Sequence, residues 1–382
     1  MRILDSTTAT GTSSRPTVAV VDLDAIRHNV RTLRPPGAEV MAVVKANGYG
    51  HGDVAVAGAA LDAGASWLGV ALVEEGIRLR HAGLDAPILV LTEFPPGSET
   101  EALAAGLTPS LYSEMGLRGV AEAARRLGAE PGVHVKVDTG MHRVGLAPES
   151  IEAFLAALSQ SGLKLEGLWT HFATSEELDD PFAHRQLQRF TAVVEGVRTA
   201  GFEPRYLHAA NSAAIMARPE THFDLVRLGI AMYGLSPGPQ LLGLADLRPA
   251  MAWKSAVSMV KRVGAGERLS YGRRYRLERE STVATVPVGY ADGYSRRLSG
   301  GGEVLINGVR LPVAGTVTMD QILVDCGGEA VQVGDEVALM GRQGSEEITA
   351  DELASKMGTI NYEVVCGVSE RVPRRYTNAG TG

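Results

Sequence analysis

The chain has 382 residues, of which 45% are hydrophobic and 21% are charged. This composition is typical of a globular protein with two or three domains and excludes a disordered chain. With 37 basic and 44 acidic residues the net charge is −7, which argues against a nucleic-acid partner because phosphate binding needs a basic surface.

No run of 18 apolar residues occurs, so the sequence predicts no membrane-spanning helix and no membrane partner. Residues 1–16 lack the apolar segment of a secretory signal, and we expect a disordered lead-in there. The only cysteines, Cys326 and Cys366, are too few for a disulfide framework. We therefore expect a cytoplasmic protein in which both thiols are small buried side chains.

Eight short apolar runs lie between residues 39 and 230, separated by segments with apolar residues at i, i+3 and i+4. The runs are EVMAVVKA (39–46), SWLGVA (66–71), PILVLT (87–92), LTPSLY (107–112), VHVKVD (133–138), LEGLWTH (165–171), PRYLHA (204–209) and FDLVRLGI (223–230). Their continuous apolarity is typical of strands buried on both faces. This alternation predicts a TIM-like (β/α)8 α/β barrel over residues 17–245, with a doubly wound open sheet as the alternative.

The pattern changes after about residue 245. The apolar runs become short, and Gly and Asp residues separate them. The pair Asn307-Gly308 is a strong hairpin signal, and one helical pattern, TADELASKMG, follows near the end. Residues 246–382 therefore read as a C-terminal mostly-β domain, and the run PTVAVVD (16–22) is a candidate for an additional strand of it.

In a barrel of this kind the active site lies at the carboxyl ends of the strands. Polar side chains gather at several of the predicted strand ends. They are Lys45, Lys136, Asp138, Arg143, His171, His208, Asn211, Ser212 and Arg227. We expect these residues to share one face of the barrel.

Lys45 directly follows the apolar run Met41 to Val44. Burial in such a run would depress the pKa of the amine, and only a neutral amine attacks a carbonyl to form a Schiff base. The alternative is a lysine at a strand end whose amine extends to solvent.

Three other kinds of site do not fit. A G-x-G-x-x-G dinucleotide motif starting at Gly48 fails at Asp53, and the chain has no Gly-Lys pair for a Walker A loop. His171 and His208 lack a recognisable third ligand, so we predict no metal site.

Two segments favour an anion instead. Asn211-Ser212 opens a helical pattern, and Gly229-Ile230 follows the eighth strand. Backbone amides after strands seven and eight are the usual phosphate site of this barrel, although Ser212 alone is equally consistent with an ordinary helix cap. A lysine on the first strand with a phosphate site across the mouth fits pyridoxal phosphate.

The motifs around these residues resemble those of the alanine racemase family, whose members use pyridoxal 5'-phosphate. The resemblance runs from about residue 17 to 376 and rests on nine motifs in the family's order. They are AVVKANGYGHG (42–52), KVDTGMHRVG (136–145), THFA (170–173), HAANSAA (208–214), VRLGIAMYG (226–234), SYG (270–272), GYADGY (289–294), GTVTMDQ (315–321) and INYEVVCGVSERVPRRY (360–376).

The resemblance implies roles for these residues. Lys45 would form the Schiff base with the cofactor and act as one catalytic base. Tyr271, supplied by the partner subunit of a homodimer, would be the other base, and His171 would orient it. Arg227 would contact the pyridine nitrogen. The remaining cofactor contacts would come from Tyr49, His208, Asn211, Ser212, Gly229, Ile230 and Tyr362.

The resemblance also implies how alanine is held. Arg143 and the backbone of Met319 would bind the substrate carboxylate. Tyr290 and Tyr362 would narrow the entrance, with Asp320 beside them. Lys136 stands at a position that is carbamylated in many members. The chain departs from the family at Thr318, where a cysteine is common.

The chemistry accounts for these residue types. Racemisation needs a base on each face of the substrate Cα, because the proton leaves one face and returns to the other. Arg227 stays protonated and therefore disfavours protonation of the pyridine nitrogen, which limits transamination.

The expected activity is the interconversion of L-alanine and D-alanine, which supplies D-alanine for peptidoglycan. Three alternatives stay open. They are a serine or broad-specificity racemase, a non-catalytic pyridoxal-phosphate-binding protein, which would lack residues 246–382, and a decarboxylase, in which an acidic residue would replace Arg227.

Overall fold

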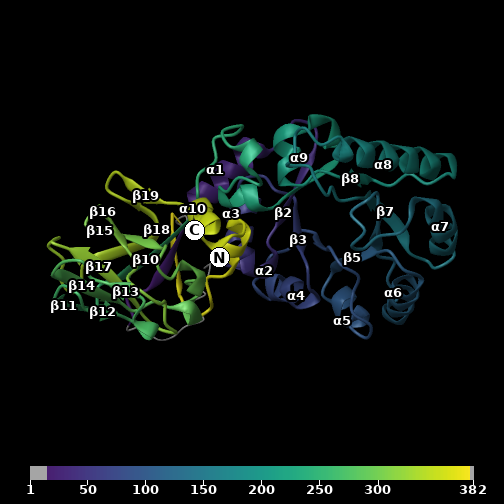
Figure 1. Ribbon diagram of the computed structural model, residues 1–382. Coiled ribbons are helices and arrows are strands. Elements are labelled where there is room, and N and C mark those ends of the chain that lie inside the picture. Colours follow the sequence, from purple (N-terminus) through teal and green to yellow (C-terminus); the bar gives the residue numbers. More distant parts are fainter. Residues whose placement is uncertain (1–14, 379–382) are drawn as a thin grey trace. The chain divides into compact units, whose positions relative to one another are not determined.

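The computed structural model describes residues 15–378, which form two compact units. The barrel unit consists of residues 25–48 and 53–248. The β unit consists of the described residues up to 24, residues 49–52 and those from 249 onward. Figure 1 labels the elements of both. Within residues 15–378, no helix is both long enough and apolar enough to cross a membrane.

The barrel unit contains eight parallel strands in the order β8-β7-β6-β5-β4-β3-β2-β9. They are β2 (Glu39–Val43), β3 (Trp67–Val70), β4 (Ile88–Val90), β5 (Leu107–Leu111), β6 (Gly132–Lys136), β7 (Lys164–Trp169), β8 (Tyr206–His208) and β9 (Leu225–Leu228). The two ends of this sheet meet, because the Arg227 amide donates to the Ala210 carbonyl at 3.0 Å. The predicted barrel is therefore confirmed and the open sheet is excluded.

Helices follow the strands and lie on the outer side of the barrel (Figure 1). They are α3 (Asp53–Asp62), α4 (Val73–His81), α5 (Glu99–Ala104), α6 (Glu114–Leu127), α7 (Ile151–Ser159), α8 (Phe182–Thr199) and α9 (Ser212–Ala217), with α1 (Leu23–Leu33) preceding β2. In α6 the Ser113 hydroxyl caps the first turn, and Gly128 ends the helix in a left-handed conformation.

The core of the barrel is built from large side chains of several strands. Met41, Trp67, Leu89, Tyr206 and Leu225 form one buried cluster. They come from β2, β3, β4, β8 and β9, so strands far apart in the sequence share one packed layer. This layer supports the strand ends that carry the polar residues.

The β unit contains a seven-stranded sheet in the order β16-β15-β18-β10-β1-β20, with β19 beside β18. A three-stranded sheet, β11-β14-β17, and a pair, β12-β13, complete it. The strands are β1 (Val18–Asp22), β10 (Met251–Ala256), β11 (Met259–Val263), β12 (Arg268–Leu269), β13 (Tyr275–Arg276), β14 (Ser281–Val286), β15 (Glu303–Ile306), β16 (Val309–Pro312), β17 (Ile322–Gly327), β18 (Glu336–Gln343), β19 (Glu346–Ile348) and β20 (Arg374–Thr377). Two short helices, α10 (Ala350–Met357) and α11 (Asn361–Cys366), accompany them.

The first strand belongs to the β unit. β1 pairs antiparallel with β10 and parallel with β20, as the run at 16–22 suggested. The barrel unit therefore differs from the expected range of 17–245 at its start, because residues 17–24 group with the β unit. The hairpin at Asn307-Gly308 is confirmed: both residues have positive φ and join β15 to β16.

The predictions for the first residues and for the two cysteines had mixed outcomes. Residues 1–14 of the predicted disordered lead-in lie outside the described residues, whereas the Arg15 side chain is ordered and binds Asp292. Cys326 is buried as expected, and burial raises the pKa of its thiol to about 11. Cys366 is exposed, so the expectation of two buried thiols was wrong there.

Candidate active site

The predicted site residues of the barrel unit lie at the carboxyl ends of its strands. Lys45 follows β2, Lys136 ends β6 and His171 follows β7. His208 ends β8, and Arg227 lies in β9. Arg227 contacts His208 at 3.0 Å and His171 at 3.1 Å, so three of these strand ends meet at its guanidinium.

The turn after Lys45 is left-handed. Ala46, Asn47 and Gly48 have φ values of 53°, 52° and 60°. A left-handed conformation costs roughly 1–2 kcal/mol for each residue that carries a Cβ. Consecutive residues in this conformation persist only where their surroundings hold them.

Glu75, near the start of α4, holds this turn from the side. One carboxylate oxygen accepts the Ala46 amide at 2.7 Å, and the other accepts the amides of Ala71 and Leu72 at 2.8 and 3.1 Å. Glu75 is buried although it is ionisable. Sequence reasoning missed it, and the available signal was an acidic residue in the first turn of a helix after an apolar strand.

Asp53 holds the other side of the turn. Its amide donates to the Asn47 side chain at 3.2 Å, and its carboxylate accepts the Nε of Arg78 at 2.7 Å. The backbone next to Lys45 is thus fixed by two buried acidic residues, Glu75 and Asp53.

Arg227 is buried inside the barrel mouth, and its guanidinium can only donate hydrogen bonds. Nη2 contacts the carbonyl oxygens of Thr170 and Ala209 at 2.7 and 2.8 Å and Nδ1 of His171 at 3.1 Å. Nη1 contacts Nδ1 of His208 at 3.0 Å. Within residues 15–378 nothing accepts a hydrogen bond from Nε or from the second N–H of Nη1, so these two N–H groups are left for a ligand.

These hydrogen bonds fix the protons of two histidines. Nδ1 of both His171 and His208 faces an Arg227 donor and must therefore accept, which leaves the proton on Nε2 of each ring. Burial, followed by the charge of Arg227, lowers the pKa of both rings well below the usual range. Burial also lowers the pKa of Arg227 to about 9, so the guanidinium stays charged near neutral pH.

Lys136 is buried beside several cations. Its Nζ lies 4.4 Å from the centre of the Trp169 ring. Burial, followed by the charges of Arg227 and Arg143, lowers the pKa of its amine to about 7, and Lys45 acts in the same direction. A substantial fraction of this amine is therefore neutral near pH 7. Arg143, in the loop after β6, is exposed.

The predicted phosphate side combines backbone amides with a serine. The Ser212 hydroxyl, at the start of α9, accepts the amides of Gly229 and Ala231 at 2.9 and 3.3 Å. Asn211 caps α9 by accepting the Ala214 amide at 3.1 Å. Gly229 and Ile230 directly follow β9, so the serine joins the chain after β8 to the chain after β9.

The β unit carries the remaining predicted residues. Tyr271 follows β12, and 73% of its surface is exposed. The Thr316 hydroxyl donates to the Tyr271 carbonyl at 2.9 Å, and the Ser270 hydroxyl donates to the Thr316 carbonyl at 2.7 Å. Residues 270–271 are thus hydrogen-bonded to Thr316 of the GTVTMDQ motif.

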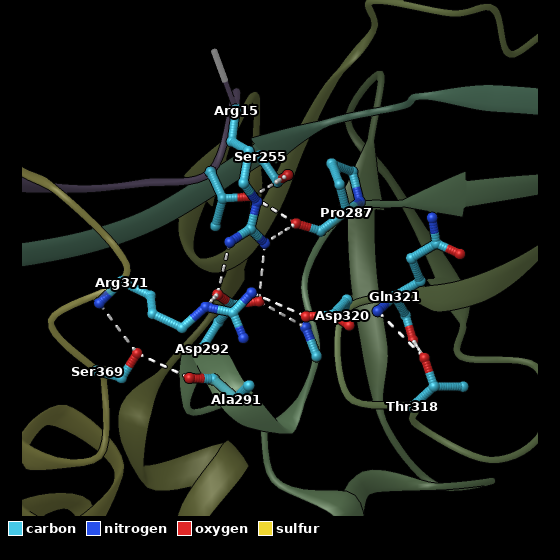
Figure 2. A network of polar contacts seen from close by, with 12 residues as sticks. Arg15, Ser255, Pro287, Ala291, Asp292, Thr318, Asp320, Gln321, Ser369 and Arg371 are labelled. Carbon is cyan, nitrogen blue, oxygen red and sulfur yellow. Dashed lines mark hydrogen bonds and ion pairs between the residues drawn. The ribbon is translucent and has the colours of Figure 1, made fainter. Parts of the chain in front are cut away.

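That motif forms a tight loop that includes Thr318, Asp320 and Gln321 (Figure 2). The Thr318 hydroxyl donates to the Gln321 carbonyl at 2.8 Å and accepts the Gln321 amide at 3.2 Å. The amide of Tyr290 donates to the Thr318 carbonyl at 3.0 Å, and that of Ala291 donates to the Met319 carbonyl at 3.1 Å. Thr318, the departure from the family pattern, therefore closes the loop that presents Met319.

Figure 2 shows a charged network that braces this loop. The buried carboxylate of Asp292 accepts two hydrogen bonds from Arg15, at 2.9 and 2.8 Å. Arg371 lies 3.6 Å from Asp292 and donates to Asp320 at 2.8 Å. Asp320 is thus tied to the rest of the β unit through Arg371. Sequence reasoning did not find Arg15, Asp292 or Arg371, since they lie far apart in the chain.

Tyr49 and Tyr362 also belong to the β unit, with ring centres 6.2 Å apart. Burial raises the pKa of the Tyr49 hydroxyl above its usual range. The described residues contain no group of three His, Cys, Asp or Glu side chains placed to hold a metal ion.

Comparisons with known proteins identify the family of the chain. Residues 21–237 match the family model "Alanine racemase, N-terminal domain", and residues 250–376 match "Alanine racemase, C-terminal domain". An alanine racemase of Symbiobacterium thermophilum is 50% identical over 367 residues, which cover 95% of this chain and 97% of that protein. These matches define a two-domain amino-acid racemase, which is an isomerase. The chain belongs to the alanine racemase family.

Solved structures show the same fold. Alanine racemase from the D-cycloserine producer Streptomyces lavendulae has a TM-score of 0.92 and 41% identity, with 96% of this chain and 98% of that chain covered. A histidine racemase from Leuconostoc mesenteroides has a TM-score of 0.89 and 28% identity, with 97% and 100% covered. Racemases named for different substrates therefore share this fold.

Proposed function

We propose that the protein interconverts L-alanine and D-alanine with pyridoxal 5'-phosphate and thereby supplies D-alanine for peptidoglycan. The observation that carries this proposal is Arg227. Its charged guanidinium is buried and held by four hydrogen-bond acceptors, and Nε stays available for a neutral ring nitrogen.

The residues present fit this cofactor. Lys45 provides an amine at the mouth of the barrel. The Ser212 hydroxyl accepts the amides of Gly229 and Ala231 and keeps its own proton, so it would donate to a phosphate together with the Ile230 amide between them. When bound, pyridoxal phosphate supplies an electron sink that weakens the Cα–H bond of an amino acid. Arg227 would limit how long the resulting negative charge persists, because a cation disfavours protonation of the pyridine nitrogen.

Two side chains of the protein would move the substrate proton. Lys45 would take or return it on one face of Cα, and Tyr271 would do so on the other. Nε2–H of His171 would donate a hydrogen bond to the Tyr271 oxygen, and this hydrogen bond would orient the tyrosine. Arg143 and the Met319 amide would hold the substrate carboxylate, with Tyr290, Tyr362 and Asp320 at the entrance.

Carbamylation of Lys136 is part of the proposal. A neutral amine attacks carbon dioxide and releases one proton to form a carbamate. Because Arg227, Arg143 and Lys45 disfavour a positive charge at this position, the negative carbamate would replace repulsion by attraction.

A homodimer would complete each site with Tyr271 of the partner subunit. Three side chains of the β unit support this. Tyr271, Met319 and Tyr290 are 73%, 52% and 42% exposed, so all three are accessible to the surface of a partner subunit.

A serine or broad-specificity racemase is the second candidate, because a histidine racemase has the same fold. Rates with alanine, serine and histidine, measured on one preparation, distinguish the two candidates.

The test of the proposed function uses Lys45→Ala, with Lys164→Ala as the control. Lys164 is exposed at the start of β7. The wild type and the control should racemise alanine and retain one borohydride-fixed cofactor per chain, and Lys45→Ala should do neither. A Lys45→Ala protein that racemises alanine would contradict the assignment.

A further inference from the structure

Another buried histidine lies next to His208, and the proposed mechanism does not use it. His134 is in β6, two residues before Lys136, and is completely buried. Its Nδ1 lies 2.9 Å from Nε2 of His208. His208 in turn contacts Arg227, so His134 is joined to the guanidinium through one ring.

The direction of every hydrogen bond in this chain of side chains follows from Arg227. Since the guanidinium only donates, Nδ1 of His208 accepts and Nε2 carries the proton. That proton must be donated to Nδ1 of His134, which places the proton of His134 on its own Nε2. Burial, followed by the charge of Arg227, lowers the pKa of His134 to about 3, so both rings are neutral near pH 7.

A carboxylate lies near Nε2 of His134, the ring nitrogen that does not contact His208. Oε2 of Glu166, in β7, lies 3.8 Å from Nε2 of His134. This distance is too long for a direct hydrogen bond, but a negative charge there favours a proton on the facing nitrogen. The series Glu166, His134, His208 and Arg227 therefore has one consistent orientation of its protons.

The backbone makes room for this series. A Cβ at Gly167 would overlap the His134 ring, and a Cβ at Gly132 would overlap the Glu166 carboxylate. The register between β6 and β7 also shifts, since Val133 pairs with Leu165 and His134 with Gly167, which leaves Glu166 as the extra residue of a bulge. Glycines in strands and bulges in parallel sheets both weaken pairing, and both occur where a side chain must be redirected.

We propose that His134, with Glu166 behind it, is a positioning residue of the reaction. It accepts the Nε2 proton of His208, so His208 presents a lone pair to Arg227 and the guanidinium keeps its orientation toward the cofactor nitrogen. This inference rests on the proposed function, because the orientation of Arg227 matters only if its guanidinium contacts the cofactor nitrogen.

The first test locates the protons by neutron diffraction on the cofactor-loaded enzyme. Protons on Nε2 of both His208 and His134 are expected. A proton on Nδ1 of His208 would overturn the proposal, and this measurement needs no variant.

The second test compares His134→Phe and His134→Asn. Phenylalanine fills the ring volume without an acceptor, whereas the asparagine oxygen can replace Nδ1. His184→Phe, at an exposed position of α8, is the control. The ratio of pyruvate formation to racemisation should rise roughly tenfold in His134→Phe, since one lost hydrogen bond to a buried donor is worth about that factor. The asparagine variant should restore the ratio.

The outcomes separate the two proposals. If His134 has only a structural role, His134→Phe should lower the cofactor content and the rates of pyruvate formation and racemisation together, with their ratio unchanged. That result would overturn the inference about His134 but leave the proposed function intact. A wild type that does not racemise alanine would refute the proposed function, while the proton positions would still decide whether His134 fixes His208.

If His134→Phe does not fold, Gly167→Ala can replace it, because the added Cβ would displace the His134 ring. Gly196→Ala is its control, since the Cβ added there meets nothing within 4 Å.

Discussion

The strained turn after Lys45 predicts the effect of Glu75→Gln. Glutamine has one amide oxygen and one amide nitrogen, so it cannot accept from Ala46 on one side and from Ala71 and Leu72 on the other. In either orientation a donor faces a donor. The left-handed turn then loses its link to α4 and becomes free to relax.

The magnitude follows from the hydrogen bonds that the substitution removes. A hydrogen bond to a charged group contributes about 1.5–3 kcal/mol, and the exposed Ala46 amide can regain a water molecule. We therefore expect Glu75→Gln to lower the free energy of unfolding by about 2–3 kcal/mol. For a unit of this size, that corresponds to a decrease in Tm of roughly 5–10 °C.

The assay has two readouts and one control. Thermal unfolding gives the change in stability, and hydrogen exchange at the amides of residues 46–48 reports the turn itself. Glu74→Gln removes the same charge from an exposed neighbour and should change neither. Unchanged exchange at residues 46–48 in Glu75→Gln would refute the idea that this carboxylate holds the turn.

Three further predictions concern the rest of the site. Because the pKa of Lys136 is lowered to about 7 from 10.5, the unfolded chain binds more protons between these pH values, so the stability of the unmodified protein should rise with pH over that window. Urea unfolding in buffer free of carbon dioxide should show this slope, Lys136→Met should lack it, and a slope that is the same in both would contradict the assignment. Tyr271→Phe should slow the loss of Cα deuterium from L-alanine by roughly 10²–10⁴ in single turnovers and much less from D-alanine; equal losses would exclude a two-base scheme. Gly289→Ala places a Cβ against the carbonyl oxygens of Thr318 and Met319, so it should destabilise the β unit by about 1–3 kcal/mol and raise the KM for alanine. Gly301→Ala, where the added Cβ meets open space, should change neither the stability nor the KM. An unchanged KM in Gly289→Ala would show that this loop takes no part in substrate binding.

The barrel was predictable because its pattern repeats. Each strand is an apolar run, and the polar site residues of the barrel unit, except Arg227 within β9, follow or end such a run. Lys45, Lys136 and His171 could therefore be placed at strand ends from their positions alone. The strand at Val18–Asp22 was harder to assign to a unit, because a five-residue apolar run carries no information about its pairing partner.

The supporting residues were not predictable for a different reason. Glu75, His134 and Arg15 act through hydrogen bonds with residues that are distant in the sequence, and Glu166 depends on a register shift between two strands. Periodicity reports which face of an element is buried but not which side chains meet there. Cys366 illustrates the same limit, since a free cysteine is usually a small buried side chain and this one is exposed.

The central claim is that each active site takes Lys45 from one subunit and Tyr271 from the other. Mixing Lys45→Ala chains with Tyr271→Ala chains, each inactive alone, tests this directly after unfolding and refolding together. Random pairing makes about half of the dimers mixed, and each mixed dimer has one intact site, so activity should return to roughly a quarter of the wild type. If subunit exchange is verified and no activity returns, Lys45 and Tyr271 of a site come from one chain, and the shared-site account is contradicted.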